Sequence, residues 1–161
     1  MNDIAIRPIE EKDNKGLASL IRTVFEEFDA PRCESVYSDP TTDRLYQYFN
    51  QPDAKYWVAV WKDIIVGGCG FYPTNGLPDG CCEVVKFYLS SSIRGKGIGS
   101  RLLLLAEEQA KKAGYKQLYI ETFPCFQAAV SLYNKMGFKE LDTRLGNSGH
   151  TATTIHMIKD I

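Results

Sequence analysis

The 161-residue chain has few histidines, almost no net charge and no long apolar segment. Its two histidines and five cysteines include no Cys-x-x-Cys pair, so we expect neither a zinc site nor a disulfide framework, and no bound metal. No apolar run approaches the ~20 residues of a transmembrane helix, which argues against a membrane partner. A net charge of −1 lacks the excess of lysine and arginine that general nucleic-acid binding requires, so we predict no nucleic-acid partner.

The first residues also lack the apolar segment of a secretion signal. Charged side chains interrupt them at Asp3, Arg7, Glu10 and Lys12. We therefore expect a cytoplasmic location. The length and an ordinary composition, with 44% hydrophobic and 24% charged residues, fit one domain over residues 1–161.

The hydrophobic pattern predicts strands and helices along the whole chain. Apolar runs predict strands over residues 4–9, 56–61, 64–72, 82–89, 116–121, 138–145 and 153–158. Apolar residues at helical spacing predict helices over residues 13–28, 45–51, 98–113 and 125–136. The strands on either side of the helix 98–113 form a predicted βαβ unit and are expected to run parallel.

A loop rich in glycine and positive charge follows the strand 82–89. Residues 94–101 have the sequence Arg-Gly-Lys-Gly-Ile-Gly-Ser-Arg and lead into a predicted helix. Glycines at alternate positions let the backbone approach a ligand and turn its N–H groups toward it. The partial positive charge of a helix N-terminus favours anions at the same place. The loop therefore predicts a site for a pyrophosphate-bearing cofactor.

Two nucleotide-binding loops fit this segment poorly. The dinucleotide fingerprint Gly-x-Gly-x-x-Gly follows its strand directly, whereas here residues 90–94 intervene and Ser100 stands at the third glycine position. A Walker loop needs Ser or Thr after its lysine, but Gly97 follows Lys96. A nicotinamide-dependent oxidoreductase remains an alternative, which stabilisation by NADH or by coenzyme A would distinguish.

The pattern Arg94-x-x-Gly97-x-Gly99 resembles the acyl-CoA signature of the GNAT superfamily of N-acetyltransferases, and the order of predicted elements matches that family. Residues 132–138, Leu-Tyr-Asn-Lys-Met-Gly-Phe, are similar to the family's helix across the cofactor. The resemblance implies an α+β fold whose mixed, mostly antiparallel sheet of six to seven strands is flanked by about four helices. It implies direct transfer of an acetyl group from acetyl-CoA to a primary amine of a small molecule or peptide.

The resemblance also implies where the cofactor binds. Main-chain groups of Phe87, Tyr88 and Leu89 would pair with the pantetheine arm. Backbone N–H groups would surround the pyrophosphate, from Arg94, Gly95, Lys96, Gly97, Ile98, Gly99 and Ser100. One departure is Phe126, which stands where many members have a cofactor-binding asparagine; that contact is lost or taken by Gln127.

The implied reaction needs a neutral amine and a proton for the departing thiolate. An alkyl amine of pKa near 10.4 is neutral only about one time in a thousand at pH 7.4, so a base is valuable. Glu83 is the candidate base: it lies eleven residues before Arg94, as in the histone acetyltransferase branch of the family. Strand alternation puts it on the face of Val85 and Phe87. The alternatives are a surface glutamate or a charge that only binds the acceptor.

Tyr133 matches the family tyrosine that gives a proton to the leaving thiolate, since a phenol stays protonated at neutral pH. The alternative is a tyrosine that only fills the core. Cys125 near a helix N-terminus leaves an acyl-cysteine mechanism open as a third alternative.

The acceptor pocket in this family forms between the first helix pair and the last hairpin. The resemblance therefore implies acceptor contacts from Tyr37, Asp39, Asn147 and His150. The acidic segment 26–43 favours a cationic acceptor. A non-catalytic acyl-CoA sensor on the same fold is an alternative function, and a homodimer is one assembly that the sequence allows.

Overall fold

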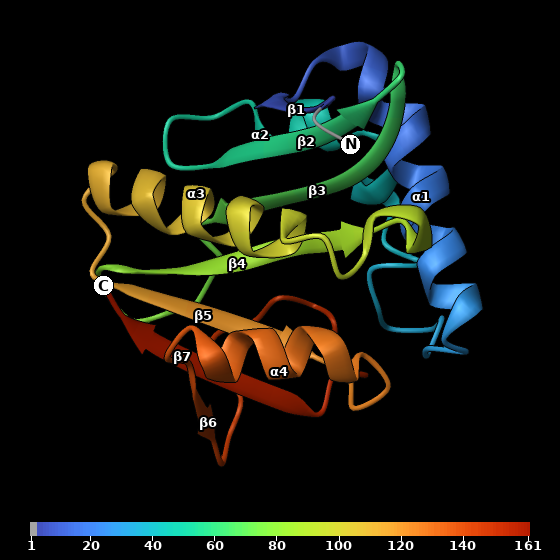
Figure 1. The fold of residues 1–161 in the computed structure, drawn as a ribbon. Helices are drawn as coiled ribbons and strands as arrows, with labels where there is room; N and C mark the ends of the chain where they lie inside the picture. Colours follow the sequence, from blue (N-terminus) through green and yellow to red (C-terminus); the bar gives the residue numbers. More distant parts are fainter. Residues whose placement is uncertain (1–2) are drawn as a thin grey trace.

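The computed structural model describes residues 3–161, and in that range one sheet of seven strands lies between two layers of helices (Figure 1). Its strands are β1 (Ile4–Pro8), β2 (Lys55–Trp61), β3 (Ile64–Tyr72), β4 (Cys81–Leu89), β5 (Gln117–Thr122), β6 (Lys139–Leu141) and β7 (Ile155–Asp160). Its helices are α1 (Asn14–Glu27), α2 (Leu45–Phe49), α3 (Ile98–Lys112) and α4 (Gln127–Lys135), with short 3-10 turns η1 (Glu11–Asp13), η2 (Pro40–Asp43) and η3 (Ser91–Ile93). The predicted α+β fold is confirmed.

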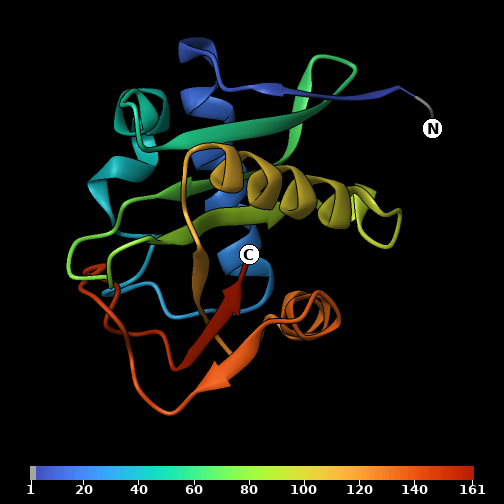
Figure 2. The same ribbon diagram turned by 90° about the vertical axis from the view of Figure 1, so that its left-hand side faces the viewer.

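The strands follow the order β1-β2-β3-β4-β5-β7-β6, with β1 and β6 at opposite ends of the sheet (Figure 2). Only β4 and β5 pair in parallel among the described residues; the other pairs are antiparallel. This arrangement confirms the predicted βαβ unit around α3.

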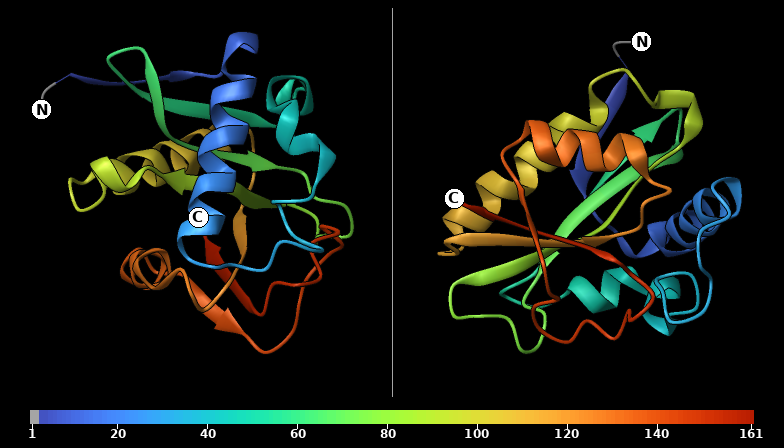
Figure 3. Two further views of the ribbon diagram at one scale, coloured as in Figure 1. Left: turned by 90° about the vertical axis from the view of Figure 1, so that its right-hand side faces the viewer. Right: turned by 90° about the horizontal axis from the view of Figure 1, so that it is seen from below.

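The helices divide between the two faces of the sheet (Figure 3). On one face, α1 buries the apolar stripe Leu17, Ile21, Val24 and Phe25 against the sheet, beside α2. On the other face, α3 and α4 cover a second core. Each helix buries the face that its apolar spacing predicts, because that burial supplies most of the stability of a short helix. No helix within residues 3–161 is long and apolar enough to cross a membrane.

The sheet splits between β4 and β5. Their parallel pairing joins only Cys81–Glu83 to Gln117–Tyr119, although both strands continue beyond it. Figure 1 shows the two strands diverging from that point. Residues 84–89 of β4 and 120–122 of β5 therefore face each other without pairing.

A β-bulge at Lys86 interrupts β4. The pairing with β3 passes from Gly70–Val85 to Gly68–Tyr88, and Lys86 has a φ of 54°. The extra residue reverses the alternation of side chains. Phe87 consequently packs with the α3/α4 core, whereas Val85 packs with the α1/α2 core. The expectation that Phe87 shares a face with Glu83 and Val85 is therefore wrong.

The end of the chain contains less strand than the sequence predicts. The predicted strands 138–145 and 153–158 correspond to β6 and β7, and residues 142–154 form an irregular connection between them. Arg144 accounts for this connection: its guanidinium donates to the carbonyls of His150, Thr151 and Thr153 and to the Glu121 carboxylate. These bonds satisfy backbone groups that a longer strand would otherwise pair.

Candidate active site

A cavity of about 370 Å³ opens where β4 and β5 diverge. Its walls include residues 83–89 of β4, residues 120–123 at and just after the end of β5, the glycine loop and start of α3, one face of α4, and residues of α1 and of the segment before β7. The exposed backbone edges of the two strands can pair with an extended chain that carries amide groups. Phe87, Tyr88 and Leu89, predicted to contact the pantetheine arm, all border this cavity.

The glycine loop closes one end of the cavity. Gly95 and Gly97 have φ of 72° and 78°, a left-handed conformation that L-residues with a side chain adopt only under strain. Gly99 differs, because a Cβ there would lie 3.0 Å from Leu89 Cδ1, so it permits close packing of α3 on β4. Ser100 also borders the cavity, and the first turn of α3 contains no acidic residue.

Three other loop residues point away from the cavity or only partly into it. Arg94 donates from Nε and Nη2 to the Leu89 carbonyl at 3.1 and 3.0 Å and pairs with Glu27, so its side chain holds the loop against β4 and α1. Lys96 Nζ donates to the Ser92 carbonyl, and Ile98 is buried in the core. Of these three, only Arg94 borders the cavity.

Glu83 lies at the point where the two strands separate. Its residue is 5% exposed, and its Oε1 accepts a hydrogen bond of 2.7 Å from Thr74 Oγ1. Burial, together with the neighbouring carboxylate of Glu121, raises the pKa of this carboxyl to about 8. The surface location considered from the sequence is therefore wrong, and the carboxyl can exchange a proton near neutral pH.

Tyr133 borders the same cavity from α4. Its residue is 4% exposed, and its ring packs against Phe87 and Phe138 with centroid distances of 6.0 and 5.8 Å. Burial raises its pKa well above 10, so the phenol keeps its proton. Within residues 3–161 its Oη forms no hydrogen bond, which leaves the proton available to a bound molecule.

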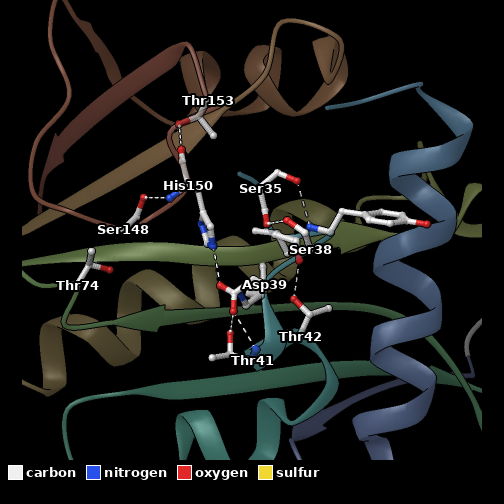
Figure 4. A network of polar contacts seen from close by, with 12 residues as sticks. Ser35, Ser38, Asp39, Thr41, Thr42, Thr74, Ser148, His150 and Thr153 are labelled. Carbon is white, nitrogen blue, oxygen red and sulfur yellow. Dashed lines mark hydrogen bonds and ion pairs between the residues drawn. The ribbon is translucent and has the colours of Figure 1, made fainter. Parts of the chain in front are cut away.

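Two of the predicted acceptor residues meet although they are far apart in the chain. His150 Nε2 lies 2.7 Å from Asp39 Oδ2, and the other oxygen of Asp39 accepts from the backbone and hydroxyl of Thr41 (Figure 4). His150 also borders a second cavity of about 160 Å³, together with Asn147 and Glu83. Glu83 and His150 border both cavities, so the two cavities share a wall.

Tyr37 is the predicted acceptor residue that the structure leaves apart from the others. Its Oη donates to Glu26 Oε1 at 2.8 Å, and the guanidinium groups of Arg22 and Arg32 lie over its ring. Tyr37 borders neither cavity.

The residues around Cys125 bear on two further expectations. Burial raises the pKa of the Cys125 thiol, which disfavours the thiolate that an acyl-cysteine mechanism needs. Phe126 joins an aromatic cluster with Phe25 and Phe28. Gln127 is exposed and does not border the cavity, which gives no support to its taking over the contact of the missing asparagine.

Lys86 was missed by the sequence analysis. It borders both cavities, its side chain is 2% exposed, and its Nζ lies 3.8 Å from Asp39 Oδ2. The only sequence signal was a lysine inside the apolar run from Val84 to Leu89. Alternation alone would put it on the α3/α4 face, and the bulge turns it to the opposite face.

Residues 20–138 match the Acetyltransferase (GNAT) family model. The chain belongs to the GNAT family. It is 36% identical, over the full length of both chains, to the Escherichia coli (strain K12) protein named uncharacterized N-acetyltransferase YjgM. Several other related N-acetyltransferases match this chain over about half of their own length. The protein is therefore an acyltransferase, as predicted.

Solved GNAT structures share the fold over nearly the whole chain. A GNAT acetyltransferase from Staphylococcus aureus Mu50 has a TM-score of 0.81 at 18% identity, with 98% of each chain covered. The PaiA N-acetyltransferase from Thermoplasma acidophilum, solved in complex with coenzyme A, has a TM-score of 0.74 at 23% identity, with 99% of each chain covered. The predicted GNAT fold is thus confirmed independently of the sequence motifs.

Proposed function

We propose that this GNAT protein is an acetyl-CoA-dependent N-acetyltransferase that transfers the acetyl group directly to a primary amine of a small molecule or peptide. The observation that carries the proposal is the pairing of two groups on one cavity. Glu83 is a carboxyl whose pKa burial raises to about 8, and Tyr133 is a phenol that retains its proton. One suits the removal of a proton and the other its delivery.

Two features of the cavity support coenzyme A as its ligand. The unpaired edge of β4 after Glu83 offers N–H and C=O groups to an amide-bearing arm. The loop at Gly95 and Gly97 offers backbone N–H groups at the N-terminus of a 15-residue helix to a pyrophosphate. A relative in fold was solved with coenzyme A, which supports the same ligand class here. Acetyl-CoA supplies the activated thioester.

Glu83 then acts as the base toward the acceptor. Its carboxyl is about one fifth ionised at pH 7.4, given its pKa of about 8. A carboxylate of raised pKa accepts the proton of an alkyl ammonium more readily than one of ordinary pKa near 4.5. The hydrogen bond from Thr74 Oγ1 orients one carboxyl oxygen and leaves the other free.

Tyr133 acts at the opposite end of the reaction as the proton donor to the departing sulfur. Packing between Phe87 and Phe138 fixes its ring, so the position of the hydroxyl is set before a ligand binds. A protonated phenol can stabilise the negative charge that develops on sulfur by a hydrogen bond.

The release of free thiol from acetyl-CoA tests this function. We expect release that depends on an added amine, in a screen of amino acids, polyamines, aminoglycosides and peptides. Coenzyme A, but not NADH, should raise the melting temperature; a ligand at 100 times its Kd contributes about 2.7 kcal/mol. Binding of coenzyme A without thiol release for any acceptor would favour the non-catalytic sensor.

A further inference from the structure

The amino group of Lys86 is buried beside the proposed base, and this burial lowers its pKa while the carboxylates of Asp39 and Glu83 oppose the shift. Its side chain is 2% exposed and borders both cavities. The bulge that carries it is held in place, because Tyr56 Oη donates a 2.7 Å hydrogen bond to the Lys86 carbonyl. Lysine is almost never fully buried without a paired charge, so the surroundings of Nζ are informative.

The ion pair between Lys86 and its nearest carboxylate is weak. The carboxylate oxygen nearest to Nζ, Asp39 Oδ2, is 3.8 Å away, beyond hydrogen-bond distance. That oxygen already interacts with His150 Nε2 at 2.7 Å, and Oδ1 accepts two bonds from Thr41. The ring of Tyr48 lies 5.6 Å from Nζ. Within residues 3–161, no acceptor forms a hydrogen bond with this ammonium.

The second cavity gives the ammonium a place to meet a ligand. Its volume is about 160 Å³, and its walls come from Tyr48 of α2, from residues 72–75, from β4 and from residues 147–150. The two loops are joined by a 2.7 Å hydrogen bond from the Asn147 N–H to the Asn75 carbonyl. Such a volume suits a molecule of few heavy atoms. Glu83 and Lys86 both border it, three positions apart on one strand.

The acidic segment 26–43 gives little support to a cationic acceptor. Four of its six carboxylates are already engaged: Glu26 with Tyr37, Glu27 with Arg94, Asp39 with His150 and Asp43 with Arg22. The other two, Asp29 and Glu34, border neither cavity. A zwitterion would add no net charge beside Asp39 and Lys86, whereas a simple cation would leave the Lys86 ammonium without a hydrogen-bonding partner.

We propose that the second cavity is an acceptor subsite for small amino acids, in which Lys86 binds the carboxylate of the acceptor while the amine lies at Glu83. The proposal rests on the proposed function and names its acceptor class: an amine with a carboxylate a few bonds away. His150 and Asn147 border the same subsite and complete its polar wall.

Matched acceptors test the subsite. Each small amino acid is compared with its amide and with the amine that lacks the carboxylate, by the rate of thiol release from acetyl-CoA. For the preferred acceptor, we expect the free carboxylate to raise kcat/KM by at least about tenfold. Equal rates for all three forms across the panel would overturn the subsite and leave the proposed function intact.

Lys86→Met adds a second readout. It keeps a long apolar side chain but removes the charge, so the preference for the carboxylate should fall toward one, mainly through KM. Lys62→Met, which changes an exposed lysine in the β2–β3 turn, is the matched control. A preserved preference in Lys86→Met would overturn the assignment.

Direct binding separates this inference from the proposed function. Calorimetric titration of the wild-type protein with the same amino acids, in the presence of coenzyme A, needs no turnover. Binding of an amino acid but not of its amide supports the subsite even if no thiol is released. Binding of neither overturns it.

Discussion

The two halves of the site differ in what they are made of. The half proposed to hold the acyl donor consists largely of main chain: the unpaired edge of β4 and the glycine loop before α3. The half proposed to hold the acceptor consists of side chains, with Glu83, Lys86, Asp39 and His150 brought together from three segments. A backbone site can bind the same cofactor in many relatives, whereas a side-chain site can change its ligand by a few substitutions.

Glu83→Gln is expected to impair the acceptor half of the site and to have the largest effect of these substitutions on activity. Loss of the base should lower kcat by about 10²-fold or more, because general base catalysis contributes on that order. Coenzyme A affinity should change little, since Glu83 lies outside the loop. In the wild type the active carboxylate is lost as the pH falls below about 8, so kcat/KM should rise with pH through that value.

Glu83→Gln should lose the rise in kcat/KM that is centred near pH 8. Glu108→Gln, at an exposed position on α3, is the matched control and should keep it. Stability gives an independent readout, because a carboxyl whose pKa is raised by folding destabilises the wild type as the pH rises from about 4.5 to 8. Glu83→Gln should not show that decline. A profile of unchanged shape would mean that the base is another group.

Tyr133→Phe is expected to have the next largest effect, at the boundary of the two halves. Removal of one hydroxyl should lower kcat by about 10- to 100-fold, with coenzyme A affinity nearly preserved. Tyr115→Phe is the matched control, because its hydroxyl bonds to the Asp53 carbonyl and borders neither cavity. If kcat is unchanged in Tyr133→Phe, the phenol only fills the core.

Gly97→Ala should impair only the donor half of the site. A side chain at a φ of 78° is strained, so we expect a loss of about 1 kcal/mol in stability and about tenfold weaker binding of coenzyme A. Gly114→Ala is a close control: its φ is 98°, and a Cβ would likewise meet nothing within 4 Å, but it ends α3 far from the loop. Equal loss of affinity in both variants would contradict a binding role for the loop.

The donor half could be predicted from the sequence because its conformation is encoded locally. Glycines occupy the alternate positions 95, 97 and 99 at the start of one amphipathic helix. The helices could be predicted for the same reason, since each buries a stripe that its own spacing defines. The pyrophosphate and pantetheine contacts remain predictions, although most of those residues border one cavity.

The acceptor half could be predicted only in part, because long-range contacts build it. Asp39 and His150 are 111 positions apart and meet through two irregular loops. Lys86 reaches the site through a bulge that no alternation pattern reveals. Residues 142–145 after β6 were predicted as strand because their pattern says nothing about the carbonyl groups that Arg144 binds.

Glu121→Gln should have the smallest effect of these substitutions, because the Glu121 carboxylate couples the two halves of the site electrostatically. Glu121 stands on the β5 wall of the larger cavity, and its carboxylate raises the pKa of Glu83. Removal of this like charge should shift the rising limb of kcat/KM to lower pH by less than about one pH unit, with little change in maximal rate. Glutamine can still accept from Thr153 and Arg144, which limits the structural change. Because burial is the larger cause of the raised pKa, a complete return of the limb to pH 4–5 would mean that charge repulsion, and not desolvation, sets the proton affinity of Glu83.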